Sequence, residues 1–287
     1  MRFAVVGDCL LDITVVPAGA ILPNADAPAR IELGPGGQAA NVAVRLARRG
    51  ATVRLVAPVA GDVAGTLLRE ALRGDAVELV ELSAERSGAV VALIENGERT
   101  MLSHRAAFSR SVADELAAAV ADAGWIHCSG YALLDPRGPE VAATLGRRPV
   151  EALLSVGGSA VPAEAATRFR ELLALARPNL LVLNRAEAAS LGPGFSTVVT
   201  DRDGSSASVG ALELRVEATA VAVLDATGAG DAYAAALIGN LSQGAWPPGA
   251  DELRGAMGAA GQLAGLVAGA LGAQARVEGE DQAIVRR

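Results

Sequence analysis

The sequence predicts an α/β fold, in which a mostly parallel central sheet is covered by helices on both faces. Short β-branched runs alternate with helical patterns through most of the chain, as is typical of such sheets. Of the 287 residues, 51% are hydrophobic and 20% are charged, which indicates a folded chain with a large core. Two stretches break the alternation and predict a second, smaller sheet.

The strands of the main sheet are predicted at short runs rich in Val, Leu and Ile, which are residues 3–7, 52–57, 125–129, 151–156, 179–183 and 196–200. Helical patterns separate these runs, at residues 38–49, 63–73, 111–121, 163–176 and 229–241. The Gly/Ala-rich stretch 256–270 is interrupted by Gln262 and is rich in glycine, which favours a buried helix over a membrane span.

The smaller sheet is predicted from two separate stretches. Residues 13–34 hold two strand-like pieces around a Pro-rich loop, and residues 88–103 form a hairpin pattern around the turn pair Asn96-Gly97. We therefore expect a small β lid from residues 13–34 and 87–103, and a main domain from residues 1–12, 35–86 and 104–287. The alternative is that these pieces are edge strands of the main sheet. An exposed edge on the lid would also allow a homodimer.

Composition excludes several classes of partner and chemistry. The net charge of −7 argues against a nucleic-acid partner, and no basic run offsets it. All 25 basic residues are Arg, so a lysine Schiff base and a lysine-bearing phosphate loop are excluded. Any phosphate must then be held by backbone amides, by Arg or by a metal.

The two cysteines and the first residues bear on the compartment. Cys9 and Cys128 each lie at the end of an apolar run, which favours buried reduced thiols over a disulfide. The opening MRFAVVGDCLLDI has no charged region, long apolar core or cleavage site of a signal peptide. We expect a cytoplasmic protein that is not attached to a membrane.

The segment Asp225-Ala226-Thr227-Gly228-Ala229-Gly230-Asp231, followed by the helical run AYAAALIGNL, is the most informative motif. A Gly-Ala-Gly turn lets backbone N–H groups approach an anion closely, and the helix that begins there adds its positive dipole end. Asp231, in the first helical turn, is placed to accept the proton of an alcohol during phosphoryl transfer. The alternative is an ordinary tight turn with Asp231 as a favourable first-turn residue.

A second glycine-led helix starts at Gly34-Pro35-Gly36-Gly37-Gln38-Ala39-Ala40-Asn41. It fits the dinucleotide fingerprint only formally, because the next strand ends in Ala57-Pro58 and not in an acid that could hold a ribose. This disfavours a dinucleotide-dependent oxidoreductase. The pair Gly36-Gly37, with Asn41 one turn later, suits backbone contact with a polyhydroxylated ligand. Asp12 is placed to accept bonds from its hydroxyls, although a loop or capping role is an equal alternative.

Together, GPGGQAANVAVRLARRG and DATGAGDAYAAALIGNL resemble the two signatures of the ribokinase-like (PfkB) family of carbohydrate kinases. Between them, Asn184-Arg185-Ala186-Glu187 resembles the family's N-x-x-E motif, and GDCLLDI resembles its substrate-binding start. The resemblance covers essentially the whole chain. It implies a ribokinase-like three-layer α/β/α domain with a small β-sheet lid.

The resemblance also implies roles for residues at matching positions. Asp231 would be the catalytic base, and the amides of Gly228, Ala229 and Gly230 would form the anion hole. The acceptor would be bound by Asp12, Gly36, Gly37 and Asn41. Arg105, just after the lid hairpin, is a further candidate for an acidic or phosphorylated acceptor, with a solvated surface role as the alternative.

For nucleotide and metal, the resemblance implies ATP and Mg²⁺. Glu187, with Asn184, would order Mg²⁺ through water, because this ion usually keeps several waters. A solvated helix start is the simpler explanation of the same pair. Asp225 is the position that the family sometimes places near a monovalent cation such as K⁺.

The nucleotide loop departs from the family pattern of Thr-x-Gly followed by a second glycine. This chain has Thr200-Asp201-Arg202-Asp203-Gly204, with Arg202 where the first glycine is expected. Two carboxylates beside a triphosphate repel it unless Arg202 or a metal compensates. Thr200, Arg202 and Gly204 are the nucleotide-binding candidates. His127, inside an apolar strand, is expected to be a satisfied core residue.

These observations predict an ATP-dependent phosphotransferase that acts on a hydroxymethyl group of a sugar or sugar derivative. A nucleoside kinase of the same fold is the closest alternative. A sugar- or nucleoside-binding regulator that has lost catalysis is the rival from another class, favoured by the unusual loop at 200–204. The acceptor itself is not identified by the sequence, because fold membership does not determine it.

Overall fold

The computed structural model describes residues 1–95, 98–159, 161, 163–219, 221–270 and 272–280. Its larger sheet contains β1 (Arg2–Val6), β4 (Thr52–Val59), β5 (Glu78–Ser83), β8 (Trp125–Cys128), β9 (Leu153–Gly157), β10 (Leu180–Asn184), β11 (Thr197–Asp201), β12 (Gly204–Val209) and β13 (Leu212–Glu217). Within these described residues the sheet has nine strands, in the order β13-β12-β11-β10-β9-β8-β1-β4-β5. Every neighbouring pair from β5 to β11 is parallel, and β12 and β13 are antiparallel.

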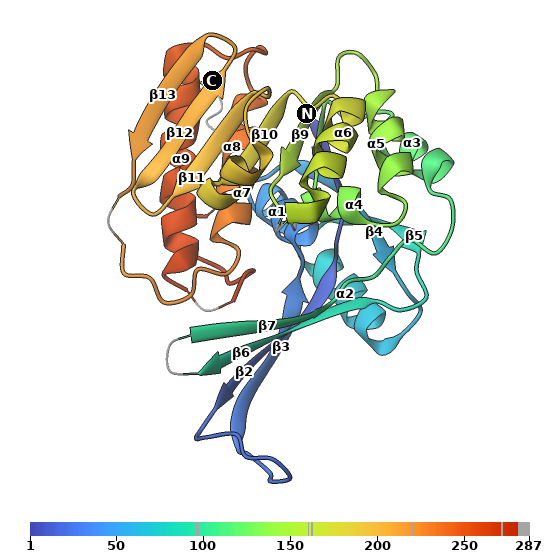
Figure 1. Cartoon of the computed structure of the whole chain (residues 1–287), viewed down its shortest axis with the longest axis vertical. Helices are drawn as coiled ribbons and strands as arrows, with labels where there is room; N and C mark the ends of the chain where they lie inside the picture. Colours follow the sequence, from blue (N-terminus) through green and yellow to red (C-terminus); the bar gives the residue numbers. More distant parts are fainter. Residues whose placement is uncertain (96–97, 160, 162, 220, 271, 281–287) are drawn as a thin grey trace.

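Helices cover both faces of this sheet, as the sequence predicts (Figure 1). One hydrophobic cluster joins the sheet to α1 (Gln38–Arg48), α8 (Ala229–Leu241) and α9 (Ala250–Ala268). A second cluster joins it to α3 (Ala113–Val120), α4 (Gly130–Leu134), α5 (Gly138–Gly146), α6 (Ala166–Ala176) and α7 (Arg185–Leu191). Parallel strands covered on both faces are largely apolar, which explains the apolar runs of β1 after Arg2 and of β10 before Asn184.

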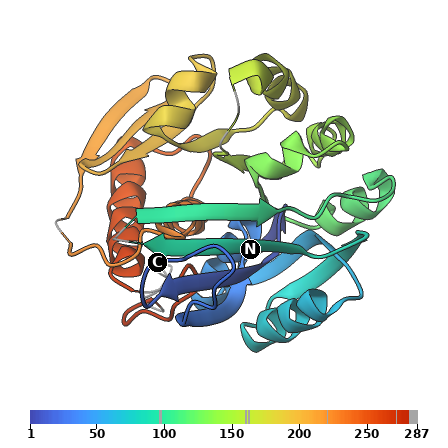
Figure 2. The same cartoon turned by 60° about the horizontal axis from the view of Figure 1, so that its bottom comes forward.

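The second sheet contains β2 (Leu10–Pro17), β3 (Ala29–Gly36), β6 (Gly88–Glu95) and β7 (Glu98–His104). Among the residues described, it has four strands in the order β3-β2-β6-β7 and is separate from the main sheet, so the edge-strand alternative is wrong. It projects below the main domain in Figure 1 and crosses in front of it in Figure 2. The predicted Asn96-Gly97 turn lies outside the described residues.

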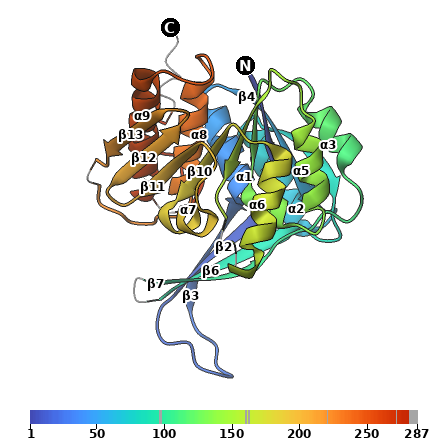
Figure 3. The same ribbon diagram turned by 45° about the horizontal axis from the view of Figure 1, so that its top comes forward.

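Five elements were not predicted, namely β5, β12, β13, α4 and α5, and the start of α7 was predicted only as an alternative explanation of Asn184 and Glu187. Glu78 and Glu81 on β5 hide its strand pattern, and they form ion pairs with Arg54 and Arg69. Helix α2 (Val63–Gly74) packs on β2, β3 and β5, beside the stem of the small sheet (Figure 3). In the described part of the chain, no helix is long and apolar enough to cross a membrane.

Candidate active site

The glycine turn before α8 is held in a conformation that only glycine adopts easily. Gly228 is the N-cap of α8 with a φ of 75°. A Cβ at Gly228 would lie 2.8 Å from the carbonyl oxygen of Ala273. Asp225 braces the turn, because its carboxylate accepts bonds from the Thr227 N–H at 2.9 Å and from the Gly272 N–H at 3.0 Å. The positive end of α8 is therefore fixed in place at this turn.

Asp231, in the first turn of α8, meets a residue 190 positions earlier in the chain. The Asn41 Nδ2 donates to Asp231 Oδ2 at 2.7 Å. The Asn41 Oδ1 in turn accepts from Gln274 Nε2 at 2.9 Å, which fixes the orientation of the Asn41 amide. The two glycine-led helices are thus joined through side chains that the sequence analysis had chosen separately.

Burial raises the pKa of Asp231 to about 7, and the hydrogen bond from Asn41 acts against this rise. The negative charge of Asp8 raises the same pKa further, whereas the positive charge of Arg45 lowers it. A carboxylate with a pKa near the working pH is suited to accept a proton and to release it again. The electrostatics of the site therefore favour Asp231 as a general base.

Asp8 is a buried site residue that the sequence analysis missed. Its Oδ1 accepts from Ser129 Oγ at 2.9 Å, and its Oδ2 accepts from the Gln38 N–H at 3.2 Å and from an Arg105 guanidinium nitrogen at 2.6 Å. The Arg105 guanidinium also stacks 3.6 Å over the ring of Tyr131. The signal for Asp8 was its place just after β1, because ligands bind at the carboxyl ends of parallel strands.

The predicted acceptor residues are not all brought to one place. Asp12 lies on β2 and packs against Gly36, where a Cβ would lie 3.0 Å from the Asp12 Cβ. It lines an open groove of about 1000 Å³ together with Thr14 and Glu32, and this groove does not include Asp231. Gly37, with a φ of 98°, lies directly against Asp8, since a Cβ there would be 2.6 Å from the Asp8 carbonyl oxygen.

A cleft of about 560 Å³ joins Asp231 to the predicted metal and nucleotide residues. Its lining includes Gly230, Asn184, Glu187 and Thr200. These residues come from the carboxyl ends of β10 and β11, from the first turn of α7 and from the start of α8. The cleft therefore brings together Asp231 and Glu187, two acids whose pKa is raised by burial.

Asn184 and Glu187 form a capping box at the start of α7. The Asn184 Oδ1 accepts from the Glu187 N–H at 2.9 Å, and the Glu187 Oε2 accepts from the Asn184 N–H at 2.8 Å. Burial raises the pKa of Glu187, and the hydrogen bond from Asn184 acts against this rise. The pair therefore does begin a helix, as the alternative explanation predicted, and the Glu187 side chain also lines the cleft.

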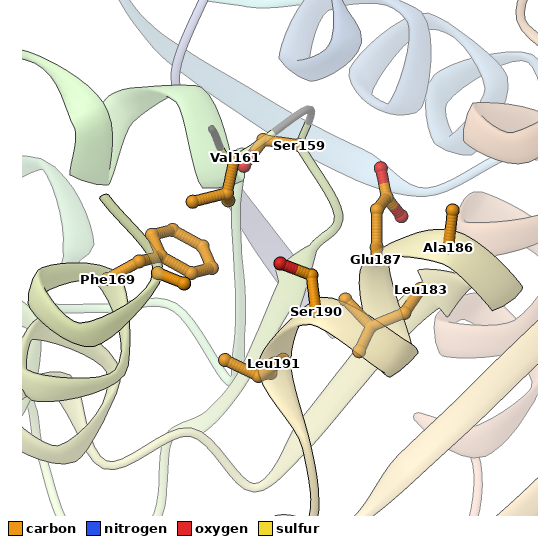
Figure 4. A pocket seen from close by; sticks show the side chains of 9 residues that line it. Ser159, Val161, Phe169, Leu183, Ala186, Glu187, Ser190 and Leu191 are labelled. Atoms are coloured by element: carbon orange, nitrogen blue, oxygen red, sulfur yellow. The ribbon is translucent and has the colours of Figure 1, made fainter. Parts of the chain in front are cut away.

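In Figure 4 the Glu187 carboxylate points away from Phe169 and Leu191, which lie at the apolar end of a neighbouring cavity of about 500 Å³. Among the described residues, no group of three or more His, Cys, Asp or Glu side chains is arranged to hold a metal. Glu187 at this polar cleft fits Mg²⁺ held mostly through water, because this ion usually keeps several waters and takes few protein ligands.

The 200–204 segment is the tight connection between β11 and β12. Asp201 forms an ion pair with Arg185 and lies 3.7 Å from an Arg215 nitrogen, so these two side chains, and not Arg202, compensate its charge. Gly204 has a φ of 142°, and a Cβ there would overlap the Val216 carbonyl, which gives the glycine a packing role. Thr200 Oγ1 donates to the Leu183 carbonyl at 3.3 Å.

His127 departs from its predicted role as a satisfied core residue. It is fully buried, and its Nδ1 lies 2.9 Å from Ser155 Oγ. Its Nε2, however, has no hydrogen-bond partner among the described residues, and the side chain lines the cleft that contains Asp231. Burial lowers the pKa of His127 to about 4, so the ring is neutral near pH 7.

Comparison with known proteins identifies the family. The model of the pfkB family carbohydrate kinases matches residues 2–192. The chain belongs to this family. The match includes the glycine-led start of α1, Asp8 and the Asn184–Glu187 pair, whereas the turn at Gly228 lies beyond the matched range. No curated protein sequence matches this chain.

Solved structures of pfkB-like proteins share the fold over nearly the whole chain. A sugar kinase from Pyrococcus horikoshii in complex with ATP is 21% identical, with a TM-score of 0.82 over 99% of this chain and 100% of that one. Adenosine kinase from Sinorhizobium meliloti is 21% identical, with a TM-score of 0.78 over 98% and 97% of the two chains. Fructokinase from Xylella fastidiosa with bound ATP is 20% identical, with a TM-score of 0.78 over 95% and 94%.

Proposed function

We propose that this pfkB family member transfers the γ-phosphoryl group of ATP to a hydroxymethyl group of a sugar or sugar derivative. The observation that carries the proposal is the position of Asp231. Its pKa is raised to about 7 by burial, it lies in the first turn of α8, and it lines a cleft that extends to Glu187. The ATP complexes of two structural neighbours support ATP as the phosphoryl donor.

In this reaction the acceptor hydroxyl oxygen forms a bond to the γ-phosphorus of ATP. The bond from that phosphorus to the β–γ bridging oxygen breaks, ADP leaves, and the hydroxyl proton passes to the Asp231 carboxylate. The amides of Gly228, Ala229 and Gly230, at the positive end of α8, stabilise the charge on the phosphoryl oxygens. Closure of the small sheet over the acceptor excludes water, so that ATP is not simply hydrolysed.

The remaining residues divide between acceptor and nucleotide. We propose that the acceptor is contacted by Asp12, Gly36, Gly37, Asn41 and Arg105. Asp8 would position two of these contacts, because it accepts hydrogen bonds from Arg105 and from the start of α1. On the nucleotide side we propose Asn184, Thr200, Arg202 and Gly204. Glu187 would hold Mg²⁺ through water, and the bound ion would supply positive charge to the phosphates. Asp225 stays our candidate for a neighbouring monovalent cation such as K⁺.

The test is a coupled ADP-release assay on a panel of pentoses, hexoses, sugar acids and nucleosides. We expect one acceptor class to give turnover, and Asp231→Asn to lower kcat by about 10²–10⁴-fold with acceptor binding retained. Asp122→Asn is the matched control, because it neutralises an exposed carboxylate far from the cleft. Near-normal turnover in Asp231→Asn, or ADP release with no acceptor in the panel, would contradict the proposal.

Two other functions stay open because specific observations favour them. The adenosine kinase neighbour favours a nucleoside as the acceptor, which the same panel tests. The β11–β12 connection, with Arg202 at its exposed tip, favours a regulator that binds a sugar or nucleoside without catalysis. Thermal stabilisation by a sugar, with none by ATP–Mg²⁺, would select the regulator.

We also infer that the lid sheet pairs with a second copy of the chain. Pairing in the sheet places Ile31, Leu33 and Leu102 on one face, and these side chains are 58%, 62% and 61% exposed. An exposed apolar face of this kind indicates an interface. Leu33→Glu is expected to convert a dimer to a monomer in sedimentation experiments. Free Cys9 and Cys128, both buried, support the cytoplasm as the compartment.

A further inference from the structure

Two buried polar atoms at the floor of the cleft face the same small space. Neither His127 Nε2 nor Gln38 Oε1 has a hydrogen-bond partner among the described residues, and both atoms are buried. The point where a Cβ on Gly157 would lie is 3.1 Å from Gln38 Oε1 and 3.2 Å from His127 Nε2. The missing side chain of Gly157 therefore leaves a space that both atoms border.

The hydrogen bonds around these atoms define which one donates. Gln38 Nε2 donates to the Gly158 carbonyl at 2.7 Å, so Gln38 Oε1 is an acceptor. Trp125 Nε1 donates to Ser155 Oγ at 2.9 Å. The Ser155 hydroxyl then has His127 Nδ1 at 2.9 Å and the Ile126 carbonyl at 3.4 Å as possible acceptors.

The shorter of these two contacts favours donation from Ser155 Oγ to His127 Nδ1. A neutral imidazole carries one proton, so accepting at Nδ1 leaves that proton on Nε2. The space over Gly157 thus has an N–H donor, from His127, on one side and a carbonyl acceptor, from Gln38, on the other. A phosphate oxygen does not suit it, because Gln38 Oε1 would repel a second acceptor.

We propose that His127 Nε2 and Gln38 Oε1 together hold one ordered water over Gly157, and that this water fixes Gln38 as a positioning residue for the cleft. Water both accepts and donates, so it satisfies the two atoms at once, and buried waters typically bridge polar groups that have no other partner. The role in catalysis rests on the proposed kinase function, whereas the water site does not depend on it.

Gln38 is placed to connect the acceptor side of the cleft to the metal side. Its backbone N–H donates to Asp8 Oδ2 at 3.2 Å, and its side chain donates to the Gly158 carbonyl. Gly158 lies directly under Glu187, because a Cβ at Gly158 would overlap the Glu187 carboxylate. Holding Gln38 in one rotamer therefore holds the backbone against which the predicted magnesium ligand rests.

Gly157→Ala tests the proposal by filling the space with a methyl group. No left-handed backbone angle is required at Gly157, and the methyl meets only the ends of two side chains. We expect the KM for ATP–Mg²⁺ to rise about tenfold, the size of one lost buried hydrogen bond, with the acceptor KM changed less than twofold. Gln38→Met keeps the side-chain volume and removes both polar atoms. It should likewise raise the KM for ATP–Mg²⁺ and leave the acceptor KM nearly unchanged.

Thr144→Val is the matched control. Thr144 Oγ1, on α5, is another buried oxygen without a hydrogen-bond partner among the described residues, and it lies outside the cleft. Its removal should leave both KM values unchanged. Equal changes of the two KM values in Gly157→Ala, or none in either, would overturn the positioning role.

A second measurement tests the water site and does not depend on enzyme turnover. The chain has two histidines, so ¹⁵N NMR of the wild type and of His104→Gln at pH 7 assigns the His127 ring nitrogens. We expect the proton on Nε2, in contact with a long-lived water, and a shifted Nε2–H signal in Gly157→Ala. A proton on Nδ1, or an unshifted signal, would overturn the water site. If the NMR result holds and no acceptor gives turnover, the proposed kinase function fails and the water site stands.

Discussion

The two glycine-led helix starts, of α1 and α8, look alike in backbone and differ in what compensates their positive ends. Both have a glycine N-cap with a positive φ, 98° at Gly37 and 75° at Gly228, and neither N-cap makes a side-chain hydrogen bond. At α1 the Gln38 N–H donates to Asp8 Oδ2 and the Ala40 N–H donates to the Asp8 carbonyl at 3.2 Å. A carboxylate of the chain itself therefore already occupies this start.

At α8, the corresponding bond is weaker and local, from the Ala229 N–H to the Ala226 carbonyl at 3.3 Å. The acid at this start, Asp231, is part of the first turn and points to Asn41. Where a buried carboxylate accepts from the first N–H groups of a helix, few donors and little positive charge remain for an external anion. A helix start without such a carboxylate attracts the anion. This difference supports our proposal that α1 orients the acceptor and that α8 receives the phosphoryl group.

The two acids should therefore have opposite effects on stability. Asp231 has a pKa raised from 3.8 to about 7, so between about pH 4 and pH 7 the folded chain keeps a proton that the unfolded chain has released, and the free energy of unfolding falls across this range. Asp231→Asn should raise the free energy of unfolding at pH 8, by up to about 4 kcal/mol at 1.36 kcal/mol per pKa unit, and the gain should vanish near pH 4.

Asp8→Asn is the matched variant, because it removes the charge that Arg105 and the start of α1 use. We expect it to lower the free energy of unfolding at pH 8 by about 1–3 kcal/mol, through loss of charge-assisted hydrogen bonds. Urea unfolding of both variants at pH 8 and pH 5 measures the contrast. If both variants lose stability at pH 8, the distinction between the two helix starts is wrong.

Substituting the two N-cap glycines separates the roles of the helices kinetically. Gly228→Ala places a methyl 2.8 Å from the Ala273 carbonyl oxygen and strains the turn, so the amides of the anion hole move. We expect kcat to fall about 10²-fold, as for loss of one oxyanion donor. Gly37→Ala places a methyl 2.6 Å from the Asp8 carbonyl oxygen and should mainly raise the acceptor KM.

Steady-state kinetics with acceptor and ATP varied independently measure this contrast. Both substitutions introduce a methyl at a positive-φ position, so the cost in folding is similar and each variant controls for the other. The same pattern of kcat and KM in both variants would mean that the two starts share one role.

The sequence predicted six of the nine described strands of the main sheet, and both helix starts, because each rests on local patterns: apolar runs, glycine turns and helix periodicity. It also predicted Asp231, Asn41 and Glu187 as site candidates. The bond from Asn41 to Asp231 joins residues 190 positions apart, and nothing local specifies it. Family knowledge placed both residues at the site without giving their contact.

Asp8 and His127 were misjudged for a related reason. The opening segment holds two acids, Asp8 and Asp12, and nothing local specifies that the Asp8 carboxylate contacts the start of α1. His127 looked like core because every neighbour in β8 is apolar. The space beside its Nε2 depends on Gly157, which lies on a different strand and has no side chain to fill that space. Such placements follow from tertiary packing and not from any one segment.

The smallest expected effect tests whether the two starts interact electrostatically. The charge of Asp8 raises the pKa of Asp231, so Asp8→Asn should lower it and move the acid limb of the kcat profile to lower pH. We expect a shift below about one pH unit, because the charges interact across a polar, partly hydrated cleft. The measurement is kcat at saturating substrates between pH 5 and pH 9.

Asp62→Asn is the control for this shift. Asp62 also lies at a helix start, where its carboxylate accepts the Gly65 N–H at 2.8 Å, but it caps α2 and does not contribute to the pKa of Asp231. It should leave the acid limb in place. An equal shift in Asp62→Asn would assign the effect to net charge, and an unmoved limb in Asp8→Asn would mean that the two helix starts titrate independently. Only a shift specific to Asp8→Asn supports a site in which Asp8, which contacts the start of α1, also raises the pKa of Asp231 in α8.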